Sequence, residues 1–396
     1  MKHHPPRIAA RLGLRVRRVA LLMDLDLGCC RNLIRGVHAY ALEKRDWVLR
    51  RSPCDPKVLS FLRDWRPDGI IATVFDREQG RTLLRLRRPV VDTAFTVRAL
   101  KLPVVDVDHA EVGRLAAEHL LERGHGHFAF LGSQSARYSS VREAGYTRHL
   151  AAAGHRVSRF LVEYLYEDFA TSSWQKDEPQ ILQWVRRLPR PVAIFACNDF
   201  AARGLVEICG QLGLRVPEDV AILGADDDEL ESLLTVPPLS TVAIPAKRVG
   251  YEAAAMLDRL MSGKSVETPL FLPPIRVIVR RSTDARATDD AVVAAALEYI
   301  RLHASQAVGV GAIAAAIGVG RRDLERRFRQ TLKRSVLDEI RQVRIEHVKE
   351  LLAGTTLQMP AIALRAGFSS PERMAVVFAQ LTGMPPSAYR QRISVQ

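Results

Sequence analysis

The decapeptide RAGFSSPERM, residues 365–374, separates two stretches that each have the periodicity of an α-helix. In the preceding segment MPAIALRAG, residues 359–367, Ile362, Ala363 and Ala366 fall on one helical face. Gly367 stands just past that helix, where a residue in the left-handed conformation is preferred. The pattern therefore predicts a helix that ends at a tight glycine turn, close to the C-terminus of the chain.

Two serines can begin the helix that follows this turn. Ser369 and Glu372 have the spacing of a capping box, and Ser370 followed by Pro371 at the first helical position is equally allowed. In both arrangements the new helix has a buried stripe formed by Met374, Val377, Phe378 and Leu381. Two short helices joined in this way form a helix-turn-helix, although a single such turn is equally typical of a corner in a helical bundle.

The turn has a second copy earlier in the chain. IAAAIGVGRRDLERRF, residues 313–328, and IALRAGFSSPERMAVVF, residues 362–378, share an Ile-Ala pair, a later glycine and a striped helix that ends in Phe. The segment VLDEIRQVRIEHVKELLAG, residues 336–354, lies between the copies and has the pattern of one long helix. The repeat predicts two helix-turn-helix units, at about 309–332 and 358–382, that present two matching surfaces.

Charge indicates what these surfaces bind. The chain has a formal net charge of +14 and, between Arg321 and Arg334, seven Lys or Arg against two acidic residues. This balance favours a polyanionic partner, and side chains at the start of a recognition helix reach base edges and phosphates. A solvated charged face is the alternative interpretation. The candidate DNA-binding residues are Arg321, Arg322, Arg326, Ser369, Ser370 and Arg373.

Residues from about 18 to 280 show short apolar runs that alternate with helical segments. The runs RVALLMD, GIIATVF, HFAFLG, VAIFACND and VAILGADDD read as strands. Strands that alternate with helices predict βαβ units and a parallel sheet, whose ligands bind beyond the carboxyl ends of the strands. The polar residues at these ends are Asp24 and Asp26, Asn198 and Asp199, and Asp226 to Asp228.

Composition and spacing bound the remaining features. The apolar run VALLM is too short for a membrane span or a signal peptide. The five cysteines include no Cys-x-x-Cys pair and are interpreted as reduced thiols of a cytosolic protein. His125 and His127 are interpreted as surface residues, and no metal site, cofactor or catalytic constellation is expected. The predicted segments are a basic tail at 1–17, an α/β domain at 18–280, a linker at 281–290 and a helical domain at 291–396.

The helical domain resembles the DNA-binding domain of AraC/XylS-type transcription factors. The matching motif is TTLQMPAIALRAGFSSPERMAVVFAQLTGMPPSAYR, residues 355–390, in which Phe378, Gly383 and Tyr389 stand at signature positions. The first unit departs from the family, because it lacks the glycine usually found near Lys333. In addition, Gly320 stands where the family commonly has a serine as N-cap.

The α/β domain resembles the effector domain of LacI/GalR-type regulators, which is similar to periplasmic sugar-binding proteins. The matching pieces include EVGRLAAEHLLERGHGHFAFLG, YSSVREAGY, FACNDFAARGLVEICGQLGLRVPEDVAILGADDDE and PPLSTVAIPAKRVGYEAAAML. The resemblance implies sugar contacts from Arg142, Asn198, Asp199 and Asp226, with Asp108 and Asp24 as weaker candidates. Arginine and carboxylates also suit adjacent hydroxyls on chemical grounds, because a sugar site needs several fixed donors and acceptors.

Two expectations accompany these site residues. Asp227 and Asp228 are interpreted as solvated or helix-capping residues that do not bind the sugar. Replacement of Arg142 or Asp226 is expected to leave folding and basal DNA binding intact, because a polar group at the edge of a cleft carries little core packing.

Together the two resemblances cover nearly the whole chain, in the order typical of the xylose-operon regulator group. They imply an α/β two-lobed periplasmic-binding-protein-like domain followed by an all-α domain with two helix-turn-helix motifs. The expected protein is a cytoplasmic, sugar-responsive transcription regulator that acts as a homodimer and leans toward activation. Its expected partners are promoter DNA, a sugar effector and RNA polymerase, without a cofactor and without a membrane.

Two other classes of protein remain open on sequence alone. Asp199 and Asp226 are paired carboxylates in principle, so a carbohydrate-active enzyme with a DNA-binding tail is one alternative. A structural DNA binder without sequence preference is the other. Turnover of pentoses or hexoses would support the enzyme, and uniform affinity for all DNA sequences would support the structural binder.

Overall fold

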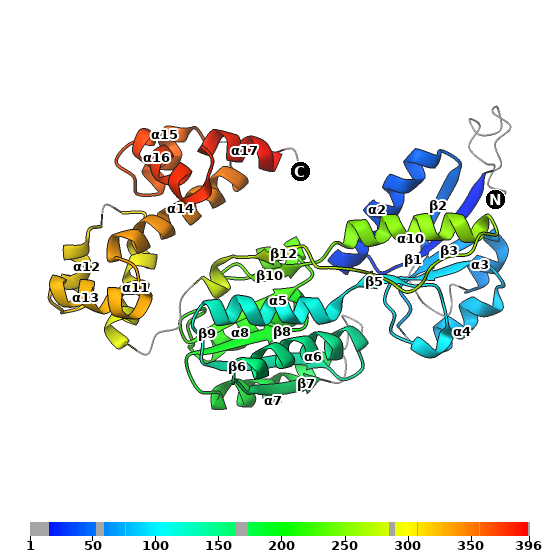
Figure 1. The fold of residues 1–396 in the computed structure, drawn as a ribbon, viewed down its shortest axis with the longest axis horizontal. Coiled ribbons are helices and arrows are strands. Elements are labelled where there is room, and N and C mark those ends of the chain that lie inside the picture. The colour runs from blue at the N-terminus through cyan, green and yellow to red at the C-terminus, as the bar shows by residue number, and fades with distance from the viewer. Residues whose placement is uncertain are drawn as a thin grey trace. The chain divides into compact units, whose positions relative to one another are not determined.

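The computed structural model describes residues 16–52, 59–75, 77–162, 173–284, 290–306, 308–355 and 357–394. Nearly all of the predicted basic tail and half of the predicted linker lie outside these ranges. The chain divides into two compact units, Met1–Ala285 and Arg286–Gln396, and each is described by itself. Figure 1 shows the arrangement of the elements within each unit.

The first unit begins with a lobe built on a four-stranded parallel sheet of order β2-β1-β3-β4. Its strands are β1 (Arg17–Leu22), β2 (Trp47–Ser52), β3 (Gly69–Ala72) and β4 (Val90–Asp92). Its helices are α2 (Gly28–Lys44), α3 (Leu59–Trp65), α4 (Arg77–Arg85) and α10 (Ala246–Met261). We call this the first lobe. It contains α10 because that helix packs along α2 and against β3.

The second lobe is built on a six-stranded sheet of order β12-β10-β9-β8-β6-β7, parallel except for the pairing of β12 with β10. Its strands are β6 (His127–Ser133), β7 (Val157–Val162), β8 (Val192–Ala196), β9 (Val220–Ala225), β10 (Ser240–Ala243) and β12 (Arg276–Ile278). Its helices are α5 (His109–Glu122), α6 (Arg137–Ala152), α7 (Ser173–Arg187), α8 (Asp199–Gln211) and α9 (Glu229–Leu233).

The chain crosses between the two lobes three times. It passes from β5 (Val105–Val107) into α5, from β10 into α10, and from β11 (Leu270–Leu272) into β12. Strands β5 and β11 pair in parallel beside these crossings. The fold is thus the two-lobed α/β architecture that the sequence predicts.

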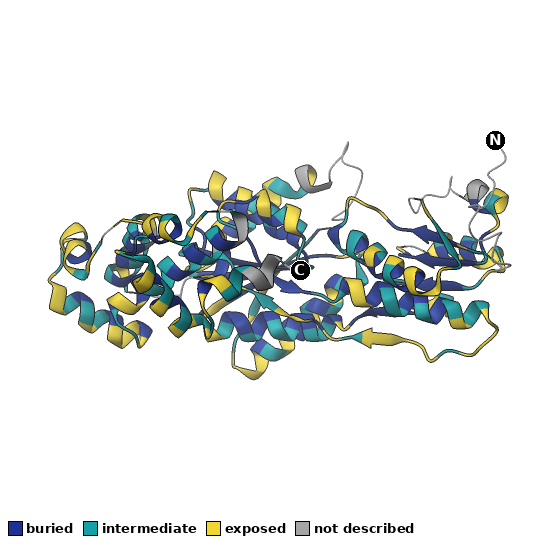
Figure 2. Ribbon diagram, turned by 90° about the horizontal axis from the view of Figure 1, so that it is seen from above, coloured by how far each residue is buried: buried dark blue, intermediate teal, exposed yellow. Residues whose placement is uncertain are grey.

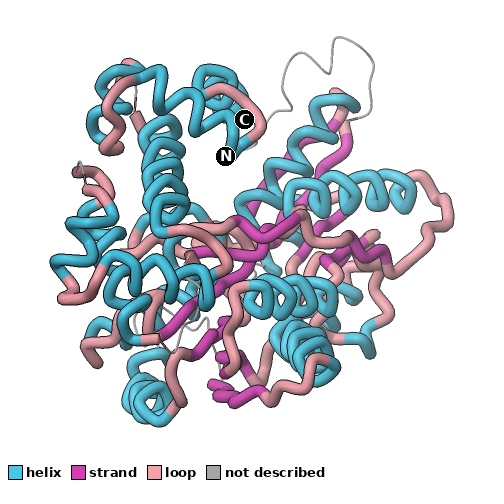
Figure 3. The backbone as a smooth tube through the Cα atoms, turned by 60° about the vertical axis from the view of Figure 1, so that its left-hand side comes forward, coloured by secondary structure: helices cyan, strands magenta, loops and turns pink. Residues whose placement is uncertain are grey.

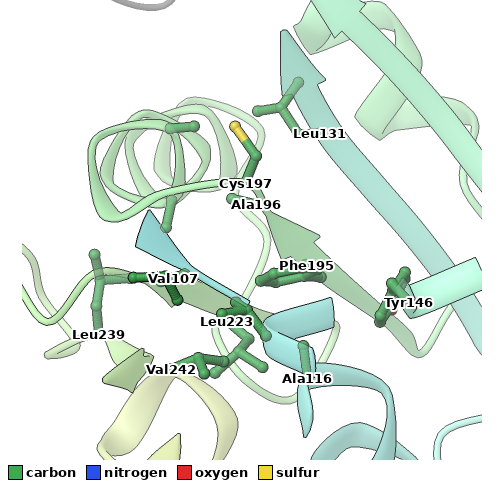
Figure 4. Packing of buried hydrophobic residues seen from close by; sticks show 14 of the residues in the cluster. Val107, Ala116, Leu131, Tyr146, Phe195, Ala196, Cys197, Leu223, Leu239 and Val242 are labelled. Carbon is green, nitrogen blue, oxygen red and sulfur yellow. The ribbon is translucent and has the colours of Figure 1, made fainter. Parts of the chain in front are cut away.

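The central strands of the second lobe have unbroken apolar sequences because both of their faces are buried in its core. Every residue of β8 and β9 is buried, as expected for parallel strands covered on both faces. Figure 4 shows Phe195 of β8 beside Tyr146 of α6, with ring centroids 5.2 Å apart. Figure 2 shows buried strands inside a shell of partly exposed helices. This rigid sheet positions the polar residues that follow its strands.

Two glycines bring helices α5 and α6 together. A Cβ atom on Gly113 would collide with the carbonyl oxygen of Arg142, and one on Gly145 would collide with the carbonyl oxygen of Ala110. The absence of both side chains allows the two backbones to touch. This close approach places Arg142 next to the start of α5.

The described residues of the second unit form helices joined by turns (Figure 3). The helices are α11 (Ala291–His303), α12 (Val310–Ala316), α13 (Arg321–Leu332), α14 (Val336–Gly354), α15 (Met359–Arg365), α16 (Pro371–Thr382) and α17 (Pro386–Ser394). Helix α14 is the long helix that the sequence predicts. It contributes Val336 and Ile340 to one core around α12 and α13, and Ile345 and Val348 to another around α15 and α16.

One interpretation of the sequence is wrong. His125 is buried, with 4 % of its surface exposed, whereas its neighbour His127 is exposed. Burial lowers the pKa of His125 to about 4, and the nearby charge of Arg123 acts in the same direction. His125 therefore belongs to the packing at the end of α5.

None of the helices in the described ranges is long and apolar enough to cross a lipid bilayer.

Candidate functional site

Arg142 of α6 is the centre of the candidate effector site and is almost completely buried, at 1 % exposure. Its Nη2 donates to Asp226 Oδ1 over 2.6 Å, and its Nη1 donates to the carbonyl oxygen of Cys197. Its Nε lies 3.3 Å from Nδ1 of His109, the first residue of α5. Three elements of the second lobe therefore fix one guanidinium group.

The electrostatics of this pair follow from burial and proximity. Burial raises the pKa of the Asp226 carboxyl, and the neighbouring guanidinium of Arg142 acts against that shift. Burial likewise disfavours the charge on Arg142, but the Asp226 carboxylate prevails and raises the pKa of Arg142. Oδ2 of Asp226 has no hydrogen-bond partner among the described residues, and the side chain is 14 % exposed. The pair thus retains an open acceptor oxygen.

Asn198 and Asp199 follow β8 and contact residues around the site. The Asn198 side chain caps α8 by accepting from Ala201 N over 2.8 Å, and its Nδ2 donates to the Tyr138 hydroxyl over 2.9 Å. The Tyr138 ring in turn lies 5.0 Å from the guanidinium carbon of Arg142. Asp199 is buried, and its Oδ2 accepts from the backbone N–H of Asp228 over 2.8 Å. Both residues hold neighbouring groups in place.

The two weaker candidates lie at the margin of the site. Asp108 is exposed and caps α5, because its Oδ1 accepts from the backbone N–H groups of Ala110 and Glu111. Asp24 is exposed in the loop after β1 of the first lobe, where its Oδ1 accepts from Asp26 N. The structure brings Arg142, Asp226, Asn198 and Asp199 together but leaves Asp108 and Asp24 with local contacts.

The first lobe faces this site through the start of α2. A hydrogen bond with Cys30 and burial raise the pKa of the Cys29 thiol well above its usual range, and the Asp226 carboxylate adds to the shift. The Cys30 sulfur also lies 3.9 Å from the Thr73 hydroxyl, just beyond β3. The Cys29 thiol of the first lobe is therefore close enough to be influenced by the charge of Asp226 in the second.

Sequence reasoning missed two residues of the site. His109 and Tyr138 both contact the Arg142 guanidinium; Tyr138 begins the motif YSSVREAGY but was not singled out within it, and His109 belongs to no quoted motif. The available signal was position. His109 is the first residue of α5, directly after its N-cap Asp108, and Tyr138 lies four residues before Arg142 on the same helix. The site can therefore offer several fixed hydrogen-bond donors and acceptors to the hydroxyl groups of a polyhydroxy compound.

The first helix-turn-helix unit consists of α12 and α13, and Arg321, Arg322 and Arg326 are all exposed on α13. Arg321 Nε donates to Glu325 over 3.1 Å, and Arg326 pairs with Asp323. No hydrogen bond or ion pair is found for Arg322 among the described residues. These arginines are available to phosphates, since exposed ion pairs along a helix are weak.

The second helix-turn-helix unit consists of α15 and α16, and the structure shows how α16 begins. Ser370 is the N-cap, its Oγ accepts from Arg373 N over 3.2 Å, and Pro371 occupies the first helical position. The capping box through Ser369 is therefore not formed, and Ser369 and Arg373 are exposed. The hydroxyl of Ser369 and the guanidinium of Arg373 lie at the start of a helix, where phosphate contacts are favourable.

The two helix-turn-helix units differ in how their second helices, α13 and α16, are capped. Gly320 caps α13 without a side-chain hydrogen bond, whereas Ser370 supplies one to α16. Lys333 ends α13 with φ 55°, in the left-handed region where Gly383 ends α16 with φ 75°. A non-glycine residue pays a steric penalty at such a position, so the first unit is capped less favourably at both ends.

A two-lobed sugar-binding-type domain joined to two helix-turn-helix units defines a sugar-responsive, DNA-binding transcription regulator. Comparison with known families agrees with this class. Residues 117–283 match the periplasmic binding protein-like domain, and residues 313–392 match a helix-turn-helix domain.

Individual relatives extend the match over 94% of the chain. The chain is 30% identical over 384 residues to the xylose operon regulatory protein of Escherichia coli K12, covering 94% of this chain and 96% of that protein. A solved structure of the xylose-binding transcription activator xylR is 28% identical, with a TM-score of 0.75, and covers 94% of this chain and 97% of that one. The cellobiose complex of the transcriptional regulator CelR covers 70% of this chain and 88% of its own at 25% identity, with a TM-score of 0.55. The chain belongs to the family of xylose operon regulatory proteins, which combine an AraC-type reader with a periplasmic-binding-protein-like effector domain.

Proposed function

We propose that the effector is a pentose of the xylose type and that it binds between the lobes against the Arg142–Asp226 pair. The observation that carries this proposal is the buried guanidinium, which three elements fix while Asp226 keeps one carboxylate oxygen open. Support comes from the relatives, which are named for xylose. Arg142, Asp226, Asn198, Asp199, Asp108 and Asp24 remain our proposed ligand-site residues.

A screen of monosaccharides by thermal unfolding tests this proposal. A sugar that binds the folded protein at a hundred times its Kd raises the free energy of unfolding by about 2.7 kcal/mol. We expect D-xylose to raise the Tm of the full chain more than glucose, ribose or arabinose at equal concentration. A protein whose Tm is unchanged by every pentose and hexose would exclude a sugar effector.

We propose further that α13 and α16 are the reading helices and enter successive major grooves on one face of the DNA. The long helix α14 supports this, because it contributes to the cores of both units and so fixes their spacing. Arg321, Arg322, Arg326, Ser369, Ser370 and Arg373 are the proposed contacts. Because successive grooves on one face are about 10 bp apart, each monomer would cover two blocks with that separation.

Salt dependence tests the proposed phosphate contacts. Log affinity for DNA is expected to fall linearly with log salt, with a slope of about −0.9 per phosphate neutralised. Arg322→Ala is expected to reduce that slope by about one and to weaken binding to all sequences alike. Arg148→Ala, which removes an exposed arginine from α6 of the first unit, is the matched control. An unchanged slope in Arg322→Ala would exclude Arg322 as a phosphate contact, and relaxed preference at one base would instead mark a base contact.

The remaining functional assignments are proposals by family. We propose that the chain acts as a homodimer in the cytoplasm, where promoter DNA is found, and that it activates transcription through RNA polymerase. Activation is supported by the solved relative, which is described as a transcription activator.

We propose no enzymatic activity for the effector domain, whose relatives are transcription regulators. The contacts of the two candidate carboxylates support this view. Asp226 binds the guanidinium of Arg142, and Asp199 is buried against the backbone of Asp228. A turnover assay with pentoses and hexoses tests this point.

A further inference from the structure

Three consecutive aspartates follow β9 in an unusual backbone conformation. Asp226 has φ 108° and Asp227 has φ 55°, both in the region that residues with side chains rarely adopt. Such a conformation persists only where the surroundings determine it. Here the Asp227 N–H donates to the Thr241 hydroxyl over 3.2 Å, and the Asp228 N–H donates to Asp199 Oδ2 over 2.8 Å. We call residues 226–228 the aspartate turn.

The first and third carboxylates of the aspartate turn reach two different sides of the effector site. Asp226 accepts from Arg142 within the second lobe, over 2.6 Å. Asp228 crosses to the first lobe, where its Oδ2 accepts from the Gly28 N–H over 2.9 Å and its Oδ1 accepts from Arg31 Nη2 over 2.8 Å. Asp228 also caps α9, as the sequence suggests, but its contacts with α2 make it a link between the lobes.

The middle carboxylate points toward the exit of the chain from the first unit. Asp227 Oδ1 accepts from Arg280 Nη2 over 3.0 Å. Arg280 is itself held to the sheet edge, since its backbone N–H donates to Ser240 Oγ and its Nη1 donates to the Leu239 carbonyl oxygen, each over 2.8 Å. Directly after it comes the short 3₁₀ helix Arg281–Thr283, beyond which the chain continues to the DNA-binding unit.

We infer that the aspartate turn couples the effector site to the DNA-binding unit, with Asp227 and Arg280 as the positioning residues of that coupling. The three neighbouring carboxylates share one strained turn, so a ligand that displaces Asp226 also displaces Asp227 and Asp228. The movement of Asp228 changes the contact between the lobes, and the movement of Asp227 changes the position of Arg280. A two-state element that both sites bias is the physical requirement for coupling. The inference rests on the proposed sugar site at Asp226.

The test separates sugar binding from the response of DNA binding. The variants are Asp227→Asn, which keeps a residue tolerant of positive φ, and Arg280→Met, which keeps the aliphatic stem. Sugar affinity is measured by calorimetry with D-xylose, and affinity for a DNA fragment selected by the wild-type protein is measured with and without saturating D-xylose. Both variants are expected to bind xylose within about twofold of wild type, while their affinity ratio with and without sugar falls close to one.

The chain offers a matched control pair and a rescue. Arg215 and Asp219 form a similarly exposed ion pair before the opposite end of β9, with 2.9 Å between Nη2 and Oδ1. Arg215→Met and Asp219→Asn are expected to keep the wild-type affinity ratio, because their pair touches neither the turn nor the exit. Arg280→Lys restores a cation and is expected to recover part of the ratio. A partly exposed ion pair contributes little to stability, so all variants are expected to fold.

The outcomes are distinct. A wild-type affinity ratio in both Asp227→Asn and Arg280→Met overturns the inference, and so does a loss of xylose affinity that accounts for the lost ratio. If circular dichroism shows that one variant is unfolded, the affinity ratio of the other variant decides whether the inference holds. A wild-type protein that binds no xylose in calorimetry overturns the proposed function instead, whatever the variants do.

Discussion

Asp226→Ala is expected to bind its sugar about ten- to a hundredfold more weakly than the wild-type protein. The substitution removes both carboxylate oxygens from a buried site, and a hydrogen bond to a charged group contributes about 1.5–3 kcal/mol. Asp226→Asn retains one acceptor oxygen and is expected to lose less affinity. Calorimetric titration with D-xylose at fixed salt measures both changes.

The control for this prediction lies at the other end of the same strand. Asp219 precedes β9 and pairs with Arg215, so Asp219→Asn also removes an acidic partner of an arginine but lies away from the site. It is expected to bind xylose as the wild-type protein does. Wild-type affinity in Asp226→Ala would show that Asp226 is not a sugar ligand, and a loss in Asp219→Asn would show that the effect is not local.

The structure changes what is expected of Arg142. From the sequence, Arg142→Ala and Asp226→Ala are expected to leave folding intact. The guanidinium is instead buried and satisfies the Cys197 carbonyl oxygen and Asp226 together. Removal of one partner of a buried ion pair costs about 3–5 kcal/mol, because the other charge stays buried without compensation. Asp226→Asn, which still offers an oxygen to Arg142, is therefore the cleaner probe of binding.

Gly367→Val is expected to abolish specific DNA contacts by the second helix-turn-helix unit without altering a residue that touches DNA. Gly367 has φ 78°, where a β-branched residue incurs strain of about 1–3 kcal/mol. A Cβ atom would also collide with the Ala304 carbonyl oxygen, which accepts from Arg344 Nε over 2.8 Å. The turn therefore has to move away from the end of α11, and α16 moves with it.

Footprinting on a selected DNA site measures this effect. The wild-type protein is expected to protect two blocks per monomer, about 10 bp apart, and Gly367→Val is expected to protect one. Gly263→Val is the control, because Gly263 has φ 72° in the first unit with open space around its Cβ position. A single protected block per monomer in the wild-type protein would contradict the use of both units, and two blocks in Gly367→Val would show that the turn tolerates the substitution.

Local patterns were sufficient to predict strands β1, β3, β6, β8 and β9 and both helix-turn-helix units, but not the other strands of the first unit. The glycine turn at Gly367, the long helix α14 and the buried strands β8 and β9 each follow from periodicity and from residues with strong backbone preferences. The choice between Ser369 and Ser370 could not be made from sequence, because both spacings satisfy a capping rule. The structure decides it through the hydrogen bond from Arg373 N to Ser370 Oγ.

The candidate site was predicted only in part, for a tertiary reason. Arg142 and Asp226 are 84 positions apart, and each was assigned through a separate motif of the LacI/GalR resemblance. Their partner His109 becomes a neighbour only because α5 and α6 touch at Gly113 and Gly145, a contact that no local pattern reveals. The burial of His125 was also missed. A polar residue between Gly124 and Gly126 has the local pattern of an exposed turn, and only the tertiary packing shows that it is buried.

The most direct test of this account is the affinity of the full chain for its selected DNA fragment with and without D-xylose, at one salt concentration. The account predicts that saturating xylose changes this affinity by about five- to 150-fold, the usual range for coupling between two sites. It predicts as well that xylose binds more tightly or more weakly by the same factor when the DNA is present, because coupling is reciprocal. Superimposable DNA-binding curves, together with calorimetric evidence that xylose is bound, would contradict a sugar-responsive regulator.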